Sequence, residues 1–411
     1  MSSGGFALSE SEIRMCQDIG SRRDAMLHDL SRYVAIPTGW NHTPGLDEFR
    51  GLVLDRLHPL GAAVRMVPGD PAPDWFWRGG RSGNPNEFIP ASAVCSRTVD
   101  GLPRILLASH LDTVFDPNGD FREIQIAADG ETAIGPGVVD MKGGIVIALH
   151  ALEALEQAGV RVSWTYLFNS DEETGSYHSE AALRAVAGEH DIGLCTEPAL
   201  PGGELAIERG GSGQFMLEVR GRSAHVGREF EKGISAVTAL AEALVKVAAM
   251  PDPAVGRVIS VGPLQGGAAT NAVPDLARAW GNVRYPQAAI ADELGTMLDA
   301  LQTEAGATPS IAVKRSFNRP AKPLTDDVQQ LGELAQSCAE SLDQRLPFAR
   351  TGGVCDGNIL QQAGLPTIDT LGVRGGGLHT PDEWIDLSSL VERCQLLALL
   401  LSRIATGALA G

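Results

Sequence analysis

Apolar residues recur along the chain in short continuous runs that alternate with segments of amphipathic spacing. Runs of about four to eight apolar residues are typical of buried strands, and apolar residues three or four apart indicate a helix. The runs predict strands over residues 93–97, 105–108, 164–169 and 365–371. The amphipathic segments predict helices over residues 9–32, 46–60, 141–158, 325–342 and 387–405. Strands that alternate with helices are typical of an α/β fold with a parallel or mixed sheet.

A second group of elements lies in the middle of the chain and has the pattern of an α+β domain. Strands are expected over residues 214–219, 257–261, 277–285 and 311–315, and helices over residues 234–249 and 290–305. We therefore expect residues 210–320 to form an inserted domain, with residues 1–209 and 321–411 as the two parts of the other domain. Residues 71–90 have the composition of a loop, and we expect Trp75 and Trp77 to anchor it rather than to form the wall of a binding site.

The composition excludes several classes of protein. The chain has 411 residues, of which 44% are hydrophobic and 20% charged, which predicts two or three folded domains and argues against global disorder. The formal net charge of −18 repels phosphate groups, so we expect neither nucleic acid nor a membrane surface as a partner. A small anionic substrate is compatible with this charge, because a few arginines can make one pocket positive.

Three features of the sequence bear on where the protein resides. The six cysteines are scattered without a Cys-x-x-Cys pair, which is typical of a reducing compartment. The first 30 residues are polar and do not have the apolar stretch of a secretory signal. No apolar run approaches the roughly 20 residues that span a bilayer. We therefore expect a cytoplasmic protein.

The residues with metal-binding or catalytic chemistry follow the predicted strands. His110 and Asp112 come after the apolar run 105–108, and residues two apart in a strand face the same side. A histidine that binds a metal usually donates its other ring N–H to a neighbouring acceptor, a role that Asp112 could fill. A single His-x-Asp sequence is more often ordinary polar surface, so this pair needs support from the rest of the chain.

Further carboxylates and a second histidine occur at comparable positions. Asp140 follows a glycine-rich turn before a predicted helix, where an aspartate alone would be interpreted as a helix cap. Glu172 and Glu173 follow another predicted strand, either as metal ligands or as a solvated acidic turn. Glu197 ends a further apolar run, and His379 follows three glycines. Together these groups lie where α/β sheets bind ligands, and mixed histidine and carboxylate ligands suit zinc, manganese or cobalt.

The order His-x-Asp, Asp, Glu-Glu, Glu, His resembles that of metallopeptidase family 20, which includes aminoacylase, acetylornithine deacetylase, succinyl-diaminopimelate desuccinylase and glutamate carboxypeptidases. The resemblance extends over about residues 106–400. Thr351-Gly352-Gly353 followed by Asp356 looks most like the carboxypeptidase G branch. The resemblance implies a mixed-sheet α/β catalytic domain that binds two metal ions, with an inserted α+β lid and dimerisation domain.

The resemblance also implies two metal sites that share one ligand. Asp140 would bridge two divalent ions. His110 and Glu197 would complete the first site. Glu173 and His379 would complete the second. The expected ion is Zn²⁺, with Mn²⁺ or Co²⁺ as alternatives.

Three catalytic roles follow from the same resemblance. Glu172 would act as general base toward a metal-bridging hydroxide that attacks a carbonyl carbon. Asp112 would orient His110. His225 would donate a hydrogen bond to the oxyanion, and in this family that histidine typically enters the active site of the partner subunit. A homodimer formed through residues 210–320 is therefore expected.

Substrate contacts are expected from both domains. Asn271 and Arg284 match family positions that hold the carboxylate end of the substrate, and Arg319 is a further candidate for that contact. Gly353 lies in the segment with the carboxypeptidase G likeness and would offer a backbone donor. Arg374 stands in a glycine run, where it would either bind a substrate carboxylate or face solvent.

The expected activity is hydrolysis of the amide bond of an N-acyl or N-aroyl amino acid that has a free carboxylate. One alternative is a hydrolytic deaminase or deacylase that acts on a non-peptide carboxylate, such as an aromatic compound that resembles an amino acid. An alternative of another class is a non-catalytic binding protein on the same scaffold. Glu172 argues against that last alternative, because a protein that only binds needs no proton shuttle.

Overall fold

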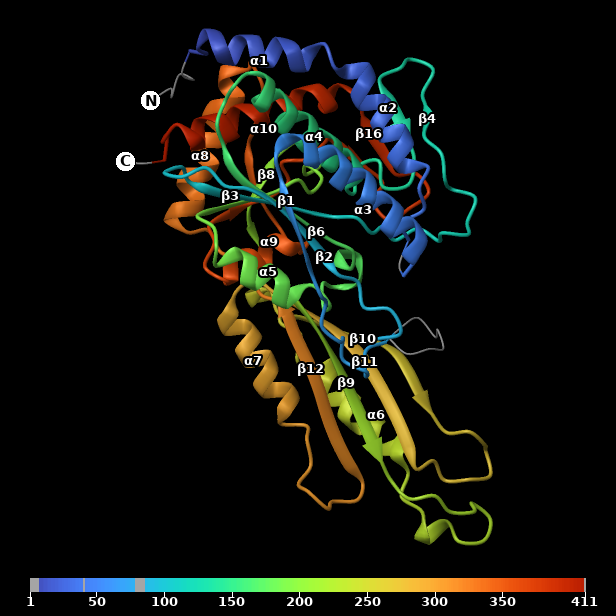
Figure 1. Cartoon of the computed structure of the whole chain (residues 1–411). Helices are drawn as coiled ribbons and strands as arrows, with labels where there is room; N and C mark the ends of the chain where they lie inside the picture. Colours follow the sequence, from blue (N-terminus) through green and yellow to red (C-terminus); the bar gives the residue numbers. More distant parts are fainter. Residues whose placement is uncertain (1–6, 40, 78–85, 410–411) are drawn as a thin grey trace.

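The computed structural model describes residues 7–39, 41–77 and 86–409. The molecule consists of an α/β body and an elongated domain that projects from it (Figure 1). The first and last helices, α1 (Glu10–Gly20) and α10 (Ser388–Ala405), lie on the body, away from the projecting domain (Figure 1). The prediction of an α/β fold with a mixed sheet and an inserted α+β domain is confirmed.

The body is built on a six-stranded sheet. In spatial order its strands are β1 (Ala63–Val67), β2 (Ser92–Arg97), β6 (Ser163–Asn169), β3 (Arg104–His110), β7 (Ile192–Cys195) and β14 (Thr367–Ile368). β3 runs parallel to its neighbours β6 and β7, and β14 runs parallel to β7. β1 and β2 are antiparallel to each other, and β2 is antiparallel to β6. The carboxyl ends of the four parallel strands therefore meet at one edge of the sheet.

Helices cover both faces of this sheet. Alternate residues of a strand face opposite sides, so Ile105 and Leu107 pack on one layer and Leu106 and Ala108 on the other. The larger layer contains α1 (Glu10–Gly20), α2 (Arg23–Val34), α3 (Thr43–Leu57), α4 (Lys142–Gln157), α8 (Asp326–Ser341) and α10 (Ser388–Ala405). The smaller layer contains α5 (Glu180–Ala187) and α9 (Asp356–Gln362). None of the described helices, including α10 with 18 residues, has the length and apolar character needed to cross a bilayer.

The projecting domain is a four-stranded antiparallel sheet with two helices on one face. Its strands, in spatial order, are β10 (Val258–Gly266), β11 (Leu276–Tyr285), β9 (Gly211–Arg220) and β12 (Ser310–Arg319), and its helices are α6 (Ala236–Ala248) and α7 (Ala288–Asp299). Phe215, Leu217 and Val219 face the helices and form the core of the domain with them. The boundaries predicted at residues 210 and 320 adjoin the first residue of β9 and the last residue of β12.

A loop of the body holds the opposite face of this sheet. Trp280, on β11, donates its indole N–H to the Trp75 carbonyl at 2.5 Å, and its ring centroid lies 5.1 Å from that of Trp77. Residues 75–77 thus form an aromatic strap between the body and the projecting domain. The prediction that these tryptophans anchor their loop is confirmed. Residues 78–85 of the predicted loop lie outside the described residues.

Two smaller sheets join distant segments of the body. One contains β15 (Gly375–Gly376), β16 (Trp384–Asp386), β5 (Thr132–Ile134) and β4 (Gln125–Ile126), and the other contains β8 (Leu205–Arg209) and β13 (Phe348–Thr351). Because β16 pairs with β5, the turn between β15 and β16 lies beside the segment between β5 and α4. This pairing matters for the site, because His379 lies in that turn and Asp140 lies in that segment.

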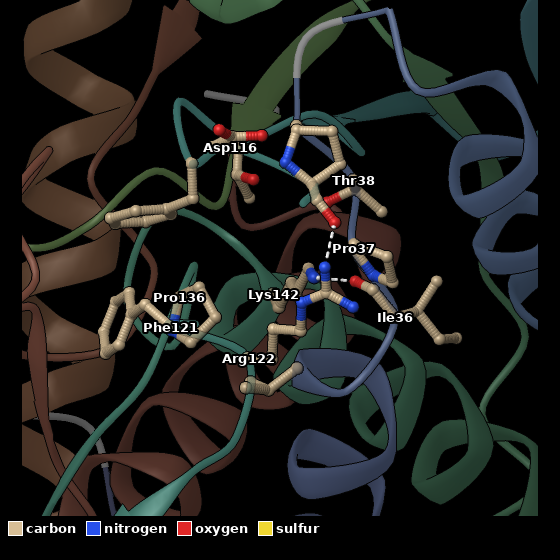
Figure 2. Close-up of a pocket in the computed structure, with 13 residues that line it drawn as sticks. Ile36, Pro37, Thr38, Asp116, Phe121, Arg122, Pro136 and Lys142 are labelled. Atoms are coloured by element: carbon tan, nitrogen blue, oxygen red, sulfur yellow. Dashed lines mark hydrogen bonds between the residues drawn. The ribbon is translucent and has the colours of Figure 1, made fainter. Parts of the chain in front are cut away.

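A buried lysine fastens the amino end of α4 to the segment that follows α2 (Figure 2). Lys142 Nζ donates to the backbone carbonyls of Tyr33 at 3.0 Å and Ile36 at 2.8 Å, and it lies 5.5 Å from the ring centroid of Phe49. Burial lowers the pKa of Lys142 to about 7. The lysine borders a cavity of about 10 Å³, which has room for about one water molecule. These contacts fix where α4 begins, and therefore the position of the neighbouring Asp140.

The single helix predicted over residues 9–32 is wrong, because the structure has two helices there, α1 and α2. α1 ends at Gly20, where the Ser21 hydroxyl donates to the Asp18 carbonyl at 2.7 Å and competes with the helical hydrogen bond. Glycine also has a low helix propensity. The apolar spacing continues across the break because both helices bury residues in the same core.

Two further elements are shorter than predicted. The helix predicted over residues 290–305 ends early, because the Thr303 N–H donates to the Ile311 carbonyl at 3.1 Å and the chain turns into β12. β14 covers 2 residues of the strand predicted over residues 365–371. Thr370 has a φ of 60°, which lies outside the strand region and ends the extended conformation.

Candidate metal centre

The five predicted metal ligands come from five separate segments that meet at the carboxyl edge of the main sheet. His110 is the last residue of β3, and Glu197 follows β7. Glu173 lies in a short 3₁₀ turn that follows β6. Asp140 precedes α4, and His379 lies in the turn between β15 and β16. Since β3, β6 and β7 are parallel neighbours, their ends deliver these side chains to one place.

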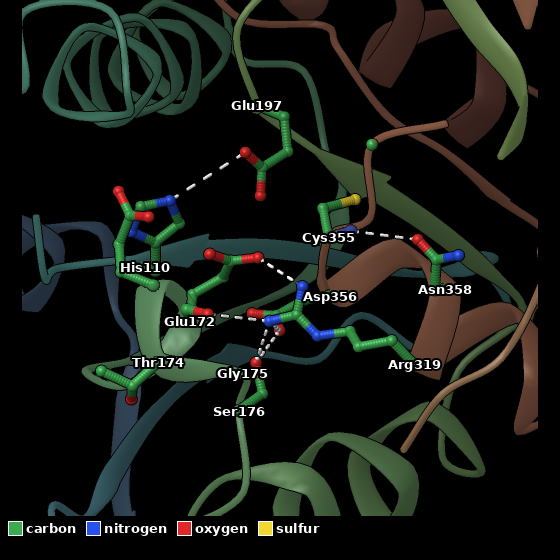
Figure 3. Close-up of polar contacts among 12 residues, drawn as sticks. His110, Glu172, Thr174, Gly175, Ser176, Glu197, Arg319, Cys355, Asp356 and Asn358 are labelled. Carbon is green, nitrogen blue, oxygen red and sulfur yellow. Dashed lines mark hydrogen bonds and ion pairs between the residues drawn. The ribbon is translucent and has the colours of Figure 1, made fainter. Parts of the chain in front are cut away.

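Asp140 lies between the two histidines. His110 Nε2 is 3.2 Å from Asp140 Oδ1 and 4.0 Å from Glu197 Oε2. Figure 3 shows the latter pair facing each other. His379 Nε2 is 3.4 Å from Asp140 Oδ2 and 3.2 Å from Glu173 Oε2. Each oxygen of Asp140 thus faces a different histidine, and a carboxylate in this position could serve two cations at once. The interpretation of Asp140 as a helix cap is wrong, because its side chain caps no helix.

This set of donors fits divalent cations. Ligand atoms of His110, Asp140 and Glu173 all lie within 4.8 Å of one another, close enough to surround one ion. Imidazole and carboxylate groups are donors that zinc, manganese and cobalt accept. Buried carboxylates at these distances repel one another unless positive charge or protons compensate them. The residues present therefore match both the chemistry and the charge of a metal centre.

Asp112 supports the centre in two ways. Its backbone carbonyl lies 2.9 Å from His110 Nδ1, and its carboxylate lies 3.5 Å from the same atom. A carbonyl only accepts, so a neutral His110 carries its hydrogen on Nδ1 and directs the Nε2 lone pair toward Asp140. The Asp112 carboxylate also accepts the backbone N–H groups of Glu172 at 3.2 Å and Glu173 at 3.0 Å. Sequence reasoning missed this second contact, which orients the acidic turn.

Protons compensate the crowded charge in the metal-free protein. Burial raises the pKa of Glu173 to about 7 and raises that of Glu197 well above its usual value. Hydrogen bonds to Asp140 and then Glu173 raise the pKa of His379 to about 10. Burial opposes the charged form of His110, but hydrogen bonds to the neighbouring carboxylates outweigh it and raise the pKa. The raised pKa values of Glu173, Glu197 and His379 favour their protonated forms, and a cation that binds there would displace those protons.

An arginine of the projecting domain holds Glu172 (Figure 3). Arg319, the last residue of β12, is buried, and its Nη1 donates to Glu172 Oε1 at 2.6 Å. Its Nη2 donates to the Glu172 carbonyl at 2.9 Å and to Ser176 Oγ at 2.7 Å, and it lies 3.7 Å from Asp356 Oδ1. The guanidinium is therefore used in contacts with the acidic turn (Glu172–Thr174) and the residues around it. This geometry favours a role for Arg319 in positioning Glu172 rather than in binding a substrate carboxylate.

The cluster opens into a cleft of about 410 Å³, a size that accommodates a small molecule. Its walls include Gly353, which was predicted to contact substrate, and a cation that sequence reasoning missed. That cation is Arg209, the last residue of β8, which pairs with Asp369 at 2.7 Å and donates from Nη1 to the Gly353 carbonyl at 3.1 Å. Arg209 lies at the end of a strand, much as Glu173 and Glu197 follow strands. A single arginine in such a position, however, is not part of any sequence pattern that would have indicated a role.

Arg284 lies beside Arg319 at the base of the projecting domain. Ser212 of β9 is the direct cross-strand neighbour of both arginines, with Arg284 on β11 and Arg319 on β12. Burial and the charge of Arg319 lower the pKa of Arg284, and its Nε donates to Asn282 Oδ1 at 3.1 Å. The two arginines therefore form a local positive region next to Glu172 in an otherwise acidic protein.

His225 and Asn271 come together in a different place. Both are exposed, in the loops that follow β9 and precede β11. These loops lie at the end of the projecting domain that is remote from the body (Figure 1). The Asn271 carbonyl accepts the Val226 N–H at 3.0 Å, and His225 Nδ1 accepts the Gly227 N–H at 3.1 Å. Within one chain these two residues are thus separated from the metal ligands by the length of the sheet.

Arg374 is engaged by carboxylates of its own region. It contacts Asp386 at 2.7 Å and Glu392 at 2.5 Å, and it also donates to Ser388 Oγ at 3.0 Å. A guanidinium held by two carboxylates has little remaining capacity for an anionic ligand. This arrangement favours a structural role for Arg374, whereas the glycines that follow it line the cleft.

Comparison with known proteins identifies the family. The model of peptidase family M20/M25/M40 matches residues 106–403. The chain belongs to this family. The resemblance inferred from the order of the histidines and acids is therefore confirmed, and this M20 family member is a hydrolase of the metallopeptidase class.

Several proteins are similar to this family member over nearly its whole length. Carboxypeptidase G2 from Pseudomonas sp. (strain RS-16) is 28% identical over 389 residues, which cover 93% of this chain and 90% of the relative. The solved structure of the dipeptidase Dug1p from Saccharomyces cerevisiae has a TM-score of 0.72 at 15% identity, covering 97% of this chain and 99% of the other. The YXEP protein of Bacillus subtilis, described as a dinuclear metal-binding peptidase of the M20 family, has a TM-score of 0.64 at 15% identity, covering 94% and 99%. The two structural likenesses show that the M20 fold is shared.

Metal binding to this M20 protein is expected to release protons. Glu173, with a pKa of about 7, and His379, with a pKa of about 10, must lose protons to bind a cation, so the affinity for Zn²⁺ falls as the pH decreases through 7. We expect about one to two protons released per ion at pH 7. Calorimetric titration in buffers of different ionisation enthalpy measures this number. An enthalpy that is independent of the buffer would contradict the charge state described above.

Proposed function

We propose that the protein is a two-metal hydrolase that cleaves the amide bond of an N-acyl or N-aroyl amino acid with a free carboxylate. The observation that carries this proposal is one cleft lined by Asp140, Glu173, Glu197 and His379 together with Glu172. Hydrolysis of an unactivated amide needs an activated water, an electrophile for the carbonyl oxygen and a proton carrier. The cleft brings together residues suited to all three.

Two Zn²⁺ ions are the proposed cofactors, with Mn²⁺ or Co²⁺ as alternatives. The proposal assigns His110 and Glu197 to one ion, and Glu173 and His379 to the other. Asp140 would be shared, which is supported by the different histidine that each of its oxygens faces. When bound, the ions would lower the pKa of a water molecule and polarise the scissile carbonyl.

Glu172 is the proposed general base. It would accept the proton of the attacking water and deliver it to the leaving nitrogen, so that the C–N bond breaks after the C–O bond forms. Burial raises the pKa of the Glu172 carboxyl, and the Arg319 guanidinium opposes part of this shift. The two effects favour a carboxylate that is more basic than a solvent-exposed one and is held in one orientation.

Arg284 is the proposed partner of the substrate carboxylate. It is partly exposed at the root of the projecting domain, across β9 from Arg319, whereas Arg319 itself is occupied with the acidic turn. A substrate held there would direct its amide toward the proposed metal ligands and its acyl group into the cleft, which Gly353 lines. A guanidinium suits this task because it binds a carboxylate through two parallel hydrogen bonds.

We further propose that two copies of the chain associate through their projecting domains. Phe230 and Val245 of this domain are 65% and 72% exposed, and a partner subunit that covered them would remove apolar surface from water. The partner's His225 would then stabilise the oxyanion, and the partner's Asn271 would contact the substrate. The remote position of these residues within one chain supports this arrangement.

The relatives support the substrate class and the metal count. Carboxypeptidase G2 is by name an enzyme that releases a residue with a free carboxylate, and the YXEP protein is described as dinuclear. The six cysteines are all buried and free, as is typical of a reducing compartment, and a cytoplasmic location stays a prediction.

The substrate class is tested by activity of the metal-loaded protein on N-aroyl glutamates, N-acetyl amino acids and aminobenzoates. We expect one of the first two groups to be hydrolysed, and activity to be lost when the substrate carboxylate is blocked as an amide. Release of ammonia from aminobenzoates alone would instead identify a deaminase.

Arg284→Met should lower kcat/KM about 10- to 100-fold because a charged hydrogen bond is lost. The matched variant Arg278→Met removes another guanidinium of β11, one that forms an ion pair with Glu218. It should leave kcat/KM unchanged.

Glu172→Gln is expected to lower kcat by about 10²- to 10⁴-fold without loss of bound metal. Glutamine has the same size and retains an oxygen for Arg319, but it cannot take up a proton. Metal content is measured by mass spectrometry on the same preparation, and the exposed variant Glu189→Gln serves as the control for activity. Turnover at the wild-type rate would remove Glu172 from the mechanism.

A mixed dimer of two inactive variants should regain part of the activity. Glu172→Gln retains His225, and His225→Ala retains Glu172, so a heterodimer contains one complete site if His225 acts across the dimer. Random exchange of subunits makes half of the dimers mixed, which gives about one quarter of the wild-type activity. Co-expression with two affinity tags yields the heterodimer for assay. A purified heterodimer that stays inactive would contradict the contribution of the partner subunit.

A further inference from the structure

Glu383 is a carboxylate with no exposed surface that lies shortly after His379. Its Oε1 accepts the backbone N–H groups of Val139 at 2.9 Å and Asp140 at 3.1 Å, and its Oε2 accepts that of Gly137 at 3.2 Å. Three backbone donors thus converge on one side chain. Such a nest of N–H groups offsets part of the cost of burying a negative charge, although burial still raises the pKa of Glu383 to about 7.

The segment that these bonds hold is the one that carries Asp140. Gly137 has a φ of 72°, a left-handed conformation that turns neighbouring N–H groups toward a common point. The Gly135 N–H donates to the Glu383 carbonyl at 3.1 Å, so the same segment is also tied to the backbone of Glu383. The Lys142 N–H donates to the Gly137 carbonyl at 2.9 Å and continues the ordered segment into α4.

The backbone of Glu383 also closes the turn that carries His379. The Glu383 N–H donates to the Thr380 carbonyl at 3.1 Å, and the Thr380 hydroxyl donates to the Gly377 carbonyl at 2.7 Å. His379 has a φ of 62°, which is sparsely populated by residues with a side chain, so the turn depends on its surroundings to keep this conformation. Glu383 provides such support, because the next residue begins β16.

We propose that Glu383 is a positioning residue that sets the separation of Asp140 and His379, and thereby the affinity of the cation site that they share with Glu173. This inference rests on the metal centre of the proposed function. The Glu383 carboxylate holds the segment that carries Asp140, and the Glu383 backbone closes the turn that carries His379. A glutamine here would present an amide N–H₂ to at least one backbone donor, and an alanine would leave three buried donors unpaired.

The test compares the wild type, Glu383→Gln and the matched control Asp382→Asn, which changes the exposed neighbouring acid. Each metal-free protein is titrated with Zn²⁺ by calorimetry, well below its melting temperature. The wild type and the control should bind two ions alike. Glu383→Gln should bind both ions more weakly, by about 10- to 100-fold for the ion assigned to Glu173 and His379 and by less for the other ion, which loses only the orientation of Asp140. Titration with Co²⁺ should show the larger change of the visible spectrum for the more weakly bound ion.

Three outcomes would overturn the inference. If Glu383→Gln binds both ions as the wild type does and only melts at a lower temperature, Glu383 serves the stability of the fold. If the two ions are weakened to the same extent, Glu383 does not act through the turn that carries His379, and circular dichroism of the same samples would show whether structure is lost in general. If the wild type binds no ion, the proposed metal centre itself fails, so that result is distinct from a failure of Glu383 alone. Glutamine is used because it matches glutamate in size, whereas alanine endangers folding.

Discussion

Several carboxylates are buried together at one edge of the main sheet. They repel one another, so the structure around them must supply groups that compensate their charge. Asp140, Glu172, Glu173 and Glu197 line the same cleft. Burial and like charge both raise the pKa of a carboxyl group, and the pKa of Glu173 reaches about 7 for these reasons. A site of this kind holds either protons or cations. Its suitability for a divalent ion therefore follows from burial as much as from the chemistry of the side chains.

Groups of opposite polarity keep each acid in its place, and they come from different parts of the fold. Asp112, after β3, accepts the backbone N–H groups of Glu172 and Glu173 after β6. Glu383, before β16, accepts three N–H groups of the segment before α4. Arg319 brings a positive charge from the projecting domain to Glu172. Each contact joins two segments, so the arrangement of the acids depends on the whole set of elements around them.

The sequence locates the predicted metal ligands better than it locates the groups that hold them in place. β3 and β6 are buried and therefore apolar, so their ends, and the acids after them, could be located from local pattern. The supports come from pairings that local pattern does not encode. Arg319 and Glu172 are 147 residues apart, and Glu383 and Val139 are 244 residues apart. The break after Gly20 was missed because both helices face one core and keep one apolar spacing.

The place of Arg319 at the root of the projecting domain has a mechanical consequence. β9 has 10 residues, so the far loops lie roughly 30 Å from that root. A rotation of about 10° at the root would carry those loops by about 5 Å, while groups near the axis would shift much less. Glu172, held by Arg319, sits close to this axis. Lever geometry would thus make the reach of the distal loops far more sensitive to a rotation at the root than the alignment of this carboxylate, and the contacts of Trp280 with residues 75 and 77 resist such a rotation.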